Sequence, residues 1–248
     1  VYAEKASNVS GIKLDGGACS VIAFVSASGG AGSSSAAAAC AKRFASQGKK
    51  TLYLNLESFG NPELYFSADG QFDLSDVIFS VKSKKANLPL KLESSVRCDS
   101  NGVYFYAGAK IALDVMELDS EEVIRLLSEL KLTGAYDYIV LDMDFSLRKP
   151  TLSVLRTAKA IVMVSDGSDT ANTKTSRVLA ALSILEQNED APLTARMRLF
   201  YNKFSNKTGK TLQGIDIKEI GGAPRYQHAT VQEIVSALAA LEAFDRII

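Results

Sequence analysis

The amino-acid sequence predicts an α/β domain of three layers, in which helices cover both faces of a mostly parallel sheet. Two observations support this prediction. Short continuous apolar runs, typical of strands buried on both faces, alternate along the chain with segments whose apolar residues recur at helical spacing. Most of these apolar runs also end in polar residues, and in an open parallel sheet ligands bind beyond the carboxyl ends of the strands. One coherent ligand site is therefore expected at that end of the sheet.

The predicted strands are runs of β-branched, aromatic and aliphatic residues. In chain order they cover residues 21–25, 51–56, 103–107, 138–141, 160–164 and 197–201. The polar residues at which five of them end are Ser26, Asn55, Asp142, Asp166 and Asn202. Because the carboxyl ends of parallel strands meet at one end of a sheet, we expect these side chains to collect around one ligand.

Helices are predicted at residues 36–47, 74–81, 121–132, 177–186 and 231–244. The first is rich in alanine and stops at Gly48, since glycine readily adopts the left-handed conformation that ends helices. In the last, Ile234, Leu238 and Leu241 form an apolar stripe, and the nearby charges are mostly acidic. A helix on a membrane surface needs Lys or Arg on its polar face, so we expect this stripe to pack on the domain.

Length and composition limit the possible functions. The 248 residues suffice for one large domain at 19–248, preceded by a polar linker or first element at 1–18, and the start at Val1 indicates a longer protein. Equal numbers of basic and acidic residues, 28 of each, give no electrostatic reason to expect nucleic acid as a partner. No apolar run approaches the roughly 20 residues that span a bilayer, so membrane insertion is not expected.

The cysteines and the histidine exclude several kinds of site. Three cysteines without metal-type spacing suit neither a disulfide framework nor a zinc cluster, and Cys19 and Cys40 are expected to pack as small apolar residues. A reducing, cytoplasmic location follows. With His228 as the single histidine, a histidine-based nucleophile triad is excluded.

The segment between the first predicted strand and the first long helix has the composition of a phosphate-binding loop. It reads Ser-Ala-Ser-Gly-Gly-Ala-Gly-Ser-Ser-Ser over residues 26–35. Backbone N–H groups in such a loop converge on an anion, and the helix dipole adds to the attraction. In the pattern G-x-x-x-x-G-K-[ST], Gly32 and Ser34 match, whereas Ala27 and Ser33 replace the first glycine and the lysine. A tight turn without a ligand is therefore the alternative for this segment alone.

In its context, the loop resembles the deviant phosphate loop of the ParA/MinD ATPases, K-G-G-x-G-K-[ST]-T, at residues 28–35. The resemblance extends from about residue 19 to 246 and implies a P-loop NTPase-like fold, with 19–248 as an atypical ATPase domain. It also implies ATP and Mg²⁺ as cofactors. The loop residues that it assigns to the nucleotide are Gly29, Gly30, Ala31, Gly32, Ser33, Ser34 and Ser35.

The same resemblance assigns roles to residues outside the loop. The run Tyr-Asp-Tyr-Ile-Val-Leu-Asp at 136–142 resembles a Walker B strand, so Asp142 and Ser34 are the expected magnesium residues. Glu57 stands where the family has a water-activating aspartate and is the catalytic candidate. Asn202, followed by a lysine, resembles a motif that reads adenine. Pro224 ends a Gly-Gly-Ala-Pro run that resembles the loop packing over the base.

Within the family, the sequence is most similar to the TadZ/CpaE pilus-assembly branch. Loops of that branch commonly carry Ser, Thr or Ala in place of the Walker lysine, and Ser33 stands at that position here. This resemblance implies a receiver-like domain before residue 1 and a homodimer that acts as a localisation switch or hub. The implied partners are pilus and secretion machinery, and the implied place is the cytoplasm, at a cell pole.

The missing lysines leave the chemistry open. Ser33 replaces the Walker lysine, Ser28 replaces the signature lysine of the family, and both positive charges are therefore absent from the loop. Lys42 and Arg43 are expected to point along the next helix rather than back at the loop. Asp144 suits either an extra magnesium carboxylate or a solvated loop residue. Phosphoryl transfer needs charge on the transferred group, so hydrolysis is expected to be weak or absent.

Three functional readings follow from these substitutions. The first is a nucleotide-dependent switch in pilus assembly, favoured by the retained Ser34, Asp142 and Asn202. The second is a nucleotide-free pseudo-ATPase scaffold for protein–protein interaction, favoured by Ser28 and Ser33. The third is a partitioning ATPase of the ParA/MinD type.

Overall fold

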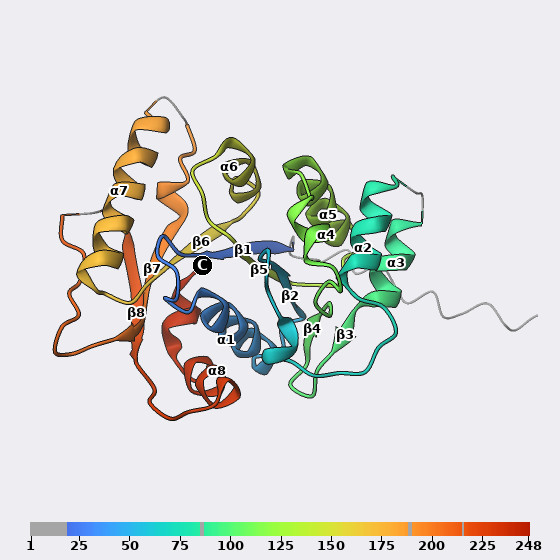
Figure 1. Ribbon diagram of the computed structural model, residues 1–248, viewed down its shortest axis with the longest axis horizontal. Helices are drawn as coiled ribbons and strands as arrows, with labels where there is room; N and C mark the ends of the chain where they lie inside the picture. The colour runs from blue at the N-terminus through green and yellow to red at the C-terminus, as the bar shows by residue number, and fades with distance from the viewer. Residues whose placement is uncertain (1–18, 85–86, 188–189, 215) are drawn as a thin grey trace, which may run out of the picture.

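An eight-stranded sheet forms the middle layer of the molecule, in the order β3-β4-β2-β5-β1-β6-β7-β8 (Figure 1). The computed structural model describes residues 19–84, 87–187, 190–214 and 216–248, so the linker or first element predicted at 1–18 lies outside the described residues. In chain order the strands are β1 (Ser20–Val25), β2 (Thr51–Leu56), β3 (Arg97–Cys98), β4 (Val103–Phe105), β5 (Tyr138–Met143), β6 (Ala160–Ser165), β7 (Met197–Phe204) and β8 (Lys218–Pro224). The short edge strand β3 runs antiparallel to β4, and the other pairings of the described strands are parallel.

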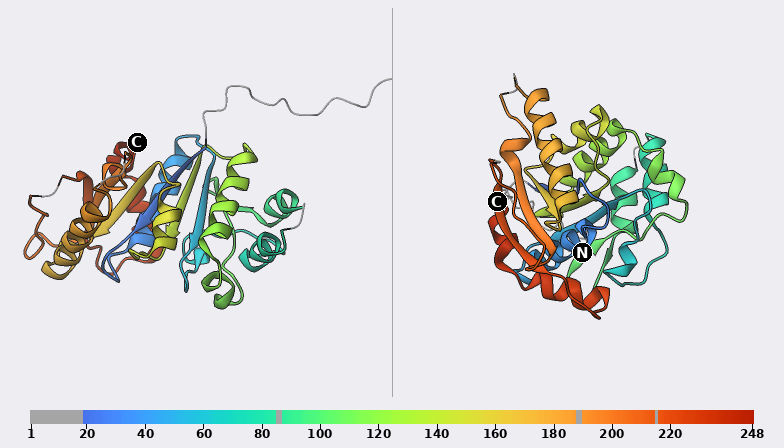
Figure 2. Two further views of the ribbon diagram at one scale, coloured as in Figure 1. Left: turned by 90° about the horizontal axis from the view of Figure 1, so that it is seen from above. Right: turned by 60° about the vertical axis from the view of Figure 1, so that its left-hand side comes forward.

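Helices cover both faces of this sheet (Figures 1 and 2). The α-helices are α1 (Ser33–Ser46), α2 (Leu74–Lys82), α3 (Leu88–Ser95), α4 (Ala112–Met116), α5 (Ser120–Leu132), α6 (Lys149–Leu155), α7 (Asp169–Leu185) and α8 (Val231–Ala239). The 3-10 helices are η1 (Pro62–Leu64), η2 (Thr194–Arg196) and η3 (Glu242–Arg246). One face packs against α1, α8 and η3, and the other against α2, α3, α5, α6 and α7. The predicted three-layer α/β architecture is confirmed.

The alternation of side chains along the strands builds two separate cores. In β1, Val21, Ala23 and Val25 belong to the core on one face, while Ile22 and Phe24 belong to the other. This period of two is inherent in a strand, and burial on both faces explains why the strand sequence is continuously apolar. All six predicted strands occur in the structure for this reason.

Alanines let helix α1 lie close to the sheet. The alanines at positions 36–39 and 41 and Cys40 are all completely buried, so the predicted role of Cys40 as a small apolar residue is confirmed. Cys19 is only half-buried but packs against the opposite core. A helix of small residues places the loop before it directly over the end of β1.

The carboxyl-terminal helix packs on the domain as predicted. Leu238 is fully buried in the core next to α1, and Ile234 and Leu241 pack against the same core. The helix ends at Ala239 rather than at residue 244, and a 3-10 turn follows. None of the helices described has the length and apolar character needed to cross a membrane.

Lys42 and Arg43 bind this carboxyl-terminal region, not the glycine-rich loop. Lys42 Nζ donates to Ser236 Oγ at 3.0 Å, and the Arg43 guanidinium pairs with the Asp245 carboxylate. The expectation that both side chains point away from the loop is thus confirmed.

The residues predicted as a loop over the base, 221–224, instead belong to strand β8. The pair Gly221-Gly222 indicates a turn when the sequence is considered alone. In the structure, the missing side chain of Gly222 lets β8 approach the backbone of β7. A Cβ on Gly222 would lie 2.7 Å from the carbonyl oxygen of Tyr201 in the neighbouring strand, which is closer than real contacts allow. Pro224 therefore ends an edge strand, where its missing N–H costs no ladder hydrogen bond.

Several other elements were missed or given different bounds. Helices α3, α4 and α6 and strands β3 and β8 were not predicted, and α1 begins at Ser33 rather than at residue 36. Helix α7 begins at Asp169 rather than at residue 177, because Ser168 Oγ accepts a hydrogen bond from the Ala171 N–H and caps a polar, threonine-rich first turn. Polar first turns carry no apolar periodicity by which to recognise them.

Candidate functional site

The glycine-rich loop joins β1 to α1 at the carboxyl end of the central strands. Gly30 and Gly32 have φ angles of 78° and 84°, a left-handed conformation that glycine adopts at low cost. Gly32 is the N-cap of α1, where no side chain caps the helix and no acidic residue lies in the first turn. Uncapped N–H groups and the positive end of a helix dipole attract anions, so this loop suits the predicted phosphate site.

Asn202, at the end of β7, braces this loop. Its Nδ2 donates to the carbonyl oxygens of Ala31 and Gly32, both at 3.2 Å, and its Oδ1 accepts from the Lys203 N–H at 3.0 Å. The side chain is 1% exposed. A Cβ on Gly32 would lie 2.4 Å from Asn202 Nδ2, so glycine is needed here for space as well as for φ.

Asp142 is a completely buried carboxylate at the end of β5. Its Oδ2 accepts from the Tyr53 hydroxyl at 2.8 Å and from Asn55 Nδ2 at 2.9 Å, whereas its Oδ1 has no hydrogen-bond partner among the described residues. Burial and, to a smaller extent, the nearby Glu57 carboxylate raise the pKa of Asp142 to about 8, although the hydrogen bond from Tyr53 acts in the opposite direction. A buried carboxylate oxygen that accepts no hydrogen bond can be satisfied by a bound cation.

Ser34 and Glu57 meet in front of Asp142. Ser34 Oγ, in the first turn of α1, donates to Glu57 Oε2 at 2.9 Å. Glu57 follows β2, whose Asn55 pairs in register with Asp142 of β5. The structure thus brings together three of the predicted residues, from α1, from β5 and from the segment that follows β2.

This oxygen set fits Mg²⁺. In the described part of the chain, no group of three His, Cys, Asp or Glu side chains is placed to hold a metal. Magnesium usually keeps several waters and takes one or two carboxylates together with substrate phosphates, rather than a complete protein cage. The orphaned Asp142 Oδ1, beside the Ser34 hydroxyl at the mouth of the loop, meets that requirement.

Two tyrosines complete the site and were not predicted from the sequence. Tyr53 is fully buried and donates to Asp142, and strand periodicity alone places it on the same face of β2 as Asn55. Tyr65, just after η1, comes close to Ser34 and Ser35. Burial and the Asp142 carboxylate raise its pKa, which hydrogen bonds with Ser35 and Ser34 counteract. The sequence around Tyr65 carries no signal for this position.

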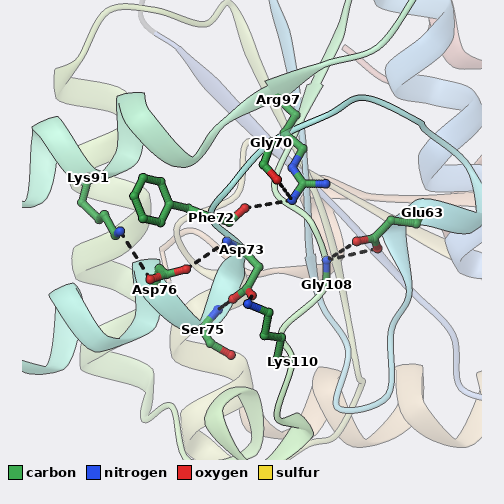
Figure 3. Close-up of polar contacts among 10 residues, drawn as sticks. All are labelled: Glu63, Gly70, Phe72, Asp73, Ser75, Asp76, Lys91, Arg97, Gly108 and Lys110. Carbon is green, nitrogen blue, oxygen red and sulfur yellow. Dashed lines mark hydrogen bonds and ion pairs between the residues drawn. The ribbon is translucent and has the colours of Figure 1, made fainter.

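The segment that carries Glu57 and Tyr65 is fastened to its surroundings (Figure 3). Arg97 donates from its guanidinium to the carbonyl oxygens of Gly70 at 3.2 Å and Phe72 at 3.0 Å. The Glu63 carboxylate accepts the Gly108 N–H, with both oxygens at 3.1 Å. These contacts fix the return path from the end of β2 to α2.

Asp73 and Asp76, at the start of α2, form a second group of contacts in the same view (Figure 3). They cap the helix reciprocally, with Asp73 accepting from the Ser75 N–H and Asp76 accepting from the Asp73 N–H. Lys110 pairs with Asp73 at 3.3 Å and Lys91 pairs with Asp76 at 3.4 Å. The segment therefore ends at the first turn of α2, which both the capping hydrogen bonds and the two ion pairs stabilise.

Asp144 is hydrogen-bonded to the segment that follows β2. Its Oδ2 accepts from the backbone N–H of Ser58 at 2.9 Å and from the Ser58 hydroxyl at 2.6 Å. Of the two alternatives left open for Asp144, neither describes it fully. It is a loop residue, but one that anchors the position next to Glu57.

Pro224 pairs with Phe204, two residues beyond Asn202 on the neighbouring strand β7. It lines a cavity of about 310 Å³ together with Tyr201, Phe204 and neighbouring residues of β8, and Asn202 is not among the lining side chains. The amide of Asn202 is turned to the phosphate loop instead. The predicted roles of Asn202 and Pro224 at the adenine base stay predictions.

Comparisons with known proteins agree with this geometry. A sequence model of the AAA domain family, AAA_31, matches residues 19–195. No curated protein sequence matches the chain. Among solved structures, the chain is similar to a ParA family ATPase from Chlorobium tepidum TLS, with 20% identity, coverage of 93% of this chain and 96% of that chain, and a TM-score of 0.70.

Two further structures were determined with a nucleotide. The septum site-determining protein MinD from Pyrococcus horikoshii OT3, complexed with Mg-ADP, is 18% identical, with coverage of 92% and 97% and a TM-score of 0.66. A putative plasmid partition protein from Borrelia burgdorferi B31, bound to AMPPNP, is 16% identical, with coverage of 93% and 99% and a TM-score of 0.58. These likenesses identify the fold as that of the ParA/MinD ATPases.

Proposed function

The chain belongs to the AAA_31 family of AAA domains, and from that membership we propose that it is a magnesium-dependent ATP-binding switch with weak or absent hydrolysis. One observation carries the proposal. The buried Asp142 keeps one carboxylate oxygen without a partner beside the Ser34 hydroxyl, at the mouth of an uncapped glycine loop. A scaffold that had lost its ligand would gain stability by replacing such a group.

In this proposal the loop residues 29–35 hold the phosphates through backbone N–H groups, and Asp142 and Ser34 hold Mg²⁺. Bound Mg²⁺ would stabilise the negative charge of the phosphate oxygens. Glu57 is the proposed catalytic carboxylate, and it accepts a hydrogen bond from the Ser34 hydroxyl. Tyr53 and Asn55 hold Asp142 in place.

Weak hydrolysis follows from the residues at positions 28 and 33. Both are serines, so neither lysine that the resemblance implies is present to bear on the γ-phosphate. Serine donates at most a hydrogen bond where a full positive charge would stabilise the transition state. The protein is therefore proposed to change state mainly by binding and release of ATP.

At the level of the cell, we assign this switch to pilus assembly of the TadZ/CpaE type, as a homodimer that recruits secretion machinery at a cell pole in the cytoplasm. The support is the sequence resemblance together with the serine at position 33. The competing scaffold reading is favoured by the same serines, and the partitioning reading by the folds of the ParA and MinD structures.

The decisive experiment is titration calorimetry with ATP in the presence and absence of Mg²⁺. Binding that strengthens with magnesium in the wild type, and loses that part in Asp142→Asn, is expected. The matched control is Asp144→Asn, which changes the same charge two residues away at a group bound to Ser58. If millimolar ATP neither produces a heat of binding nor raises Tm, the proposal of a nucleotide-dependent switch is wrong, and the scaffold reading remains.

Base selection is the second part of the proposal, with Asn202 and Pro224 as its residues. The structure offers Asn202 a competing role, since its amide already contacts the loop carbonyls of Ala31 and Gly32. Titrating ATP and GTP against wild type and Asn202→Ala separates the two roles. If Asn202 reads the base, wild type prefers ATP and the variant loses that preference. If Asn202 only braces the loop, both nucleotides weaken by the same factor.

A further inference from the structure

A cavity lies at the amino-terminal end of the sheet, away from the glycine-rich loop. Its volume is about 360 Å³, near the lower end of what is usual for ligand pockets. Phe44, Tyr138, Phe244 and Ile248 give it an apolar lining, to which Lys49 adds a charge. Tyr138 begins strand β5, and the candidate magnesium ligand Asp142 follows four residues later on that strand, roughly 13 Å away. The cavity is therefore separate from the candidate nucleotide site.

The lining of this cavity is well packed, and its acid is already paired. The rings of Phe44 and Tyr138 lie 4.6 Å apart between centroids. Asp245 also lines the cavity, but its carboxylate accepts hydrogen bonds from the Arg43 guanidinium and from the Gln47 amide. The charge left open at the cavity is consequently that of Lys49.

Exposed basic side chains stand at the starts of strands on both sides of the cavity. Lys49 and Lys50 precede β2, Lys159 precedes β6, and Lys218 is the first residue of β8. None of the ion pairs formed within the described residues involves these four lysines. Lys218 is also paired in register with Arg198 of β7, and like charges opposite one another destabilise a sheet. These five residues are called the basic row.

The basic row keeps a net positive charge and has the length of a short peptide. The acids at the same strand starts are Asp137, whose carboxylate accepts the Lys50 N–H at 2.8 Å, and Asp216 and Glu219, which flank Lys218 in the sequence. From β2 to β8 the sheet order contains five strand spacings of about 4.8 Å. The row therefore spans about 24 Å, the length of about seven extended residues.

We propose that the basic row and the cavity together bind an acidic segment of a partner protein, which places one apolar side chain in the cavity. Carboxylates of the segment pair with the lysines and set its orientation along the strand starts. The apolar side chain is the anchor, since a buried anchor in a pocket carries most of the affinity of such interfaces. This interaction is independent of the proposed nucleotide binding, because it uses the opposite end of the sheet.

A protein segment fits both features, whereas other polyanions fit only one. The phosphates of duplex DNA and the headgroups of an anionic membrane meet the charges but provide no side chain for an apolar cavity. Single-stranded nucleic acids are bound by stacking on accessible aromatic rings. The largely exposed phenylalanines of the described residues, Phe59 and Phe79, lie on the segment after β2 and on α2 instead.

The test is fluorescence anisotropy with a labelled peptide of Asp and Glu, long enough to span the row, in which acids flank one phenylalanine. It is titrated with the wild type, Lys49→Glu/Lys50→Glu, Lys218→Glu and Lys207→Glu. Lys207 is the matched control, because it is exposed and follows the other end of β7. Each of the first two charge reversals is expected to weaken binding about tenfold, the size of one lost interface contact. Lys207→Glu is expected to bind as the wild type does, and all variants to keep its Tm.

A second peptide tests the anchor. Replacing its phenylalanine by alanine is expected to weaken binding to the wild type about tenfold. Ile248→Asp puts a charge on the half-exposed residue of the cavity lining and is expected to weaken the phenylalanine peptide to the level of the alanine peptide. The alanine peptide itself should lose little further affinity for this variant beyond the added charge.

The outcomes separate the proposal from its alternatives. Absent peptide binding, binding that the lysine changes leave intact, or equal affinity for both peptides would each overturn it. Duplex DNA and anionic vesicles are titrated in parallel, and tighter binding of either, lost in the same lysine variants, would overturn a protein as the partner. The titrations contain no nucleotide, so their failure leaves the proposed ATP binding untouched.

Discussion

At the scale of single residues, the molecule keeps several groups that a stable fold alone would not keep. Asp142 is buried with one unsatisfied oxygen, and Lys203 holds a left-handed backbone. A buried unpartnered carboxylate disfavours the native state whenever it is charged. At neutral pH the free protein therefore carries a proton on the Asp142 carboxyl group, which we propose as a magnesium ligand.

This proton makes stability depend on pH. The pKa of Asp142 is about 8 in the folded protein, against about 3.9 for an aspartate in an unfolded chain. Between these values the native state binds a proton that the unfolded state lacks, so the contribution of Asp142 to the free energy of unfolding falls as pH rises from about 4 to about 8. We predict that the stability of the wild type relative to Asp142→Asn declines over this range. Urea denaturation in EDTA at several pH values measures it, and a constant difference would contradict the prediction.

Gly32 is the second position at which a single atom decides the outcome. We predict that Gly32→Ala destabilises the protein and abolishes ATP binding, because the new methyl group meets Asn202 Nδ2 at 2.4 Å and the φ of 84° is strained for alanine. Gly48→Ala is a matched control, since its φ is 77° but nothing lies within 4 Å of the added Cβ. The control should lose only about 1 kcal/mol to backbone strain and retain binding. Equal effects of both changes on Tm and affinity would mean that the contact with Asn202 is unimportant.

At the scale of elements, the site depends on strand register and on the segment that follows β2. The pairing of Asn55 with Asp142 places the two side chains next to each other, and a shift of β2 by one residue would turn Asn55 to the opposite face of the sheet. The segment from Glu57 to Asp73 leaves the sheet, passes Tyr65 across the loop and returns to α2. Its position depends on polar contacts and on the burial of Phe66 in the core rather than on strand pairing.

Arg97 is the residue that holds most of this return path. Its guanidinium donates to the carbonyl oxygens of Ala68, Gly70 and Phe72. We predict that Arg97→Ala leaves these carbonyls without a protein donor, costs roughly 1–3 kcal/mol, and speeds amide hydrogen exchange in residues 57–73 but not in β1 or α1. Exchange measured by mass spectrometry on native protein tests it.

The control for this experiment is Arg125→Ala. Arg125 donates from its guanidinium to the Val81 carbonyl oxygen, at the far end of α2. Its loss should affect exchange around Val81 and leave residues 57–73 unchanged. If Arg97→Ala leaves exchange in residues 57–73 as slow as in the wild type, the packing of the segment and not Arg97 fixes it.

At the scale of the whole molecule, the three layers of the fold and part of the candidate site can be predicted from the sequence. The six strands buried on both faces are predictable because burial forces continuous apolar runs, and the phosphate loop, Ser34 and Asp142 follow in the order of a recognisable motif. Strand β8 is not predictable in the same way, because its glycines serve a close approach that only the neighbouring Tyr201 reveals.

The rest of the site arises from tertiary placement. Tyr65 and Lys203 reach the loop from positions 30 or more residues away in sequence, and Lys203 does so only through a bulge and a positive φ. No periodicity or spacing encodes such an approach. Asp144 shows the same limit, since its partner Ser58 follows a different strand.

The charges missing from the loop lead to a last prediction, that Ser33→Lys alone raises ATP affinity but changes hydrolysis little. Phosphoryl transfer needs charge on the γ-phosphate, magnesium and a positioned water together, and groups that act as a unit are strongly non-additive. Ser33→Lys supplies one cation, but Ser28 still lacks the second, and Glu57 remains a longer side chain than the aspartate that the resemblance implies, hydrogen-bonded to the Ser34 hydroxyl at 2.9 Å. The added lysine also contacts the phosphates of bound ATP before any reaction, so its gain falls on binding.

Steady-state phosphate release from the wild type, Ser33→Lys and the Ser28→Lys/Ser33→Lys double variant tests this prediction, with a ParA-type enzyme assayed in parallel. Little gain is expected from the single change and a larger one from the double change, because only the latter restores both positive charges. If the single variant reached the rate of the parallel enzyme, Glu57 and the retained magnesium residues would form a complete catalytic set. The serine at position 33 would then be the one substitution that keeps this ATPase slow.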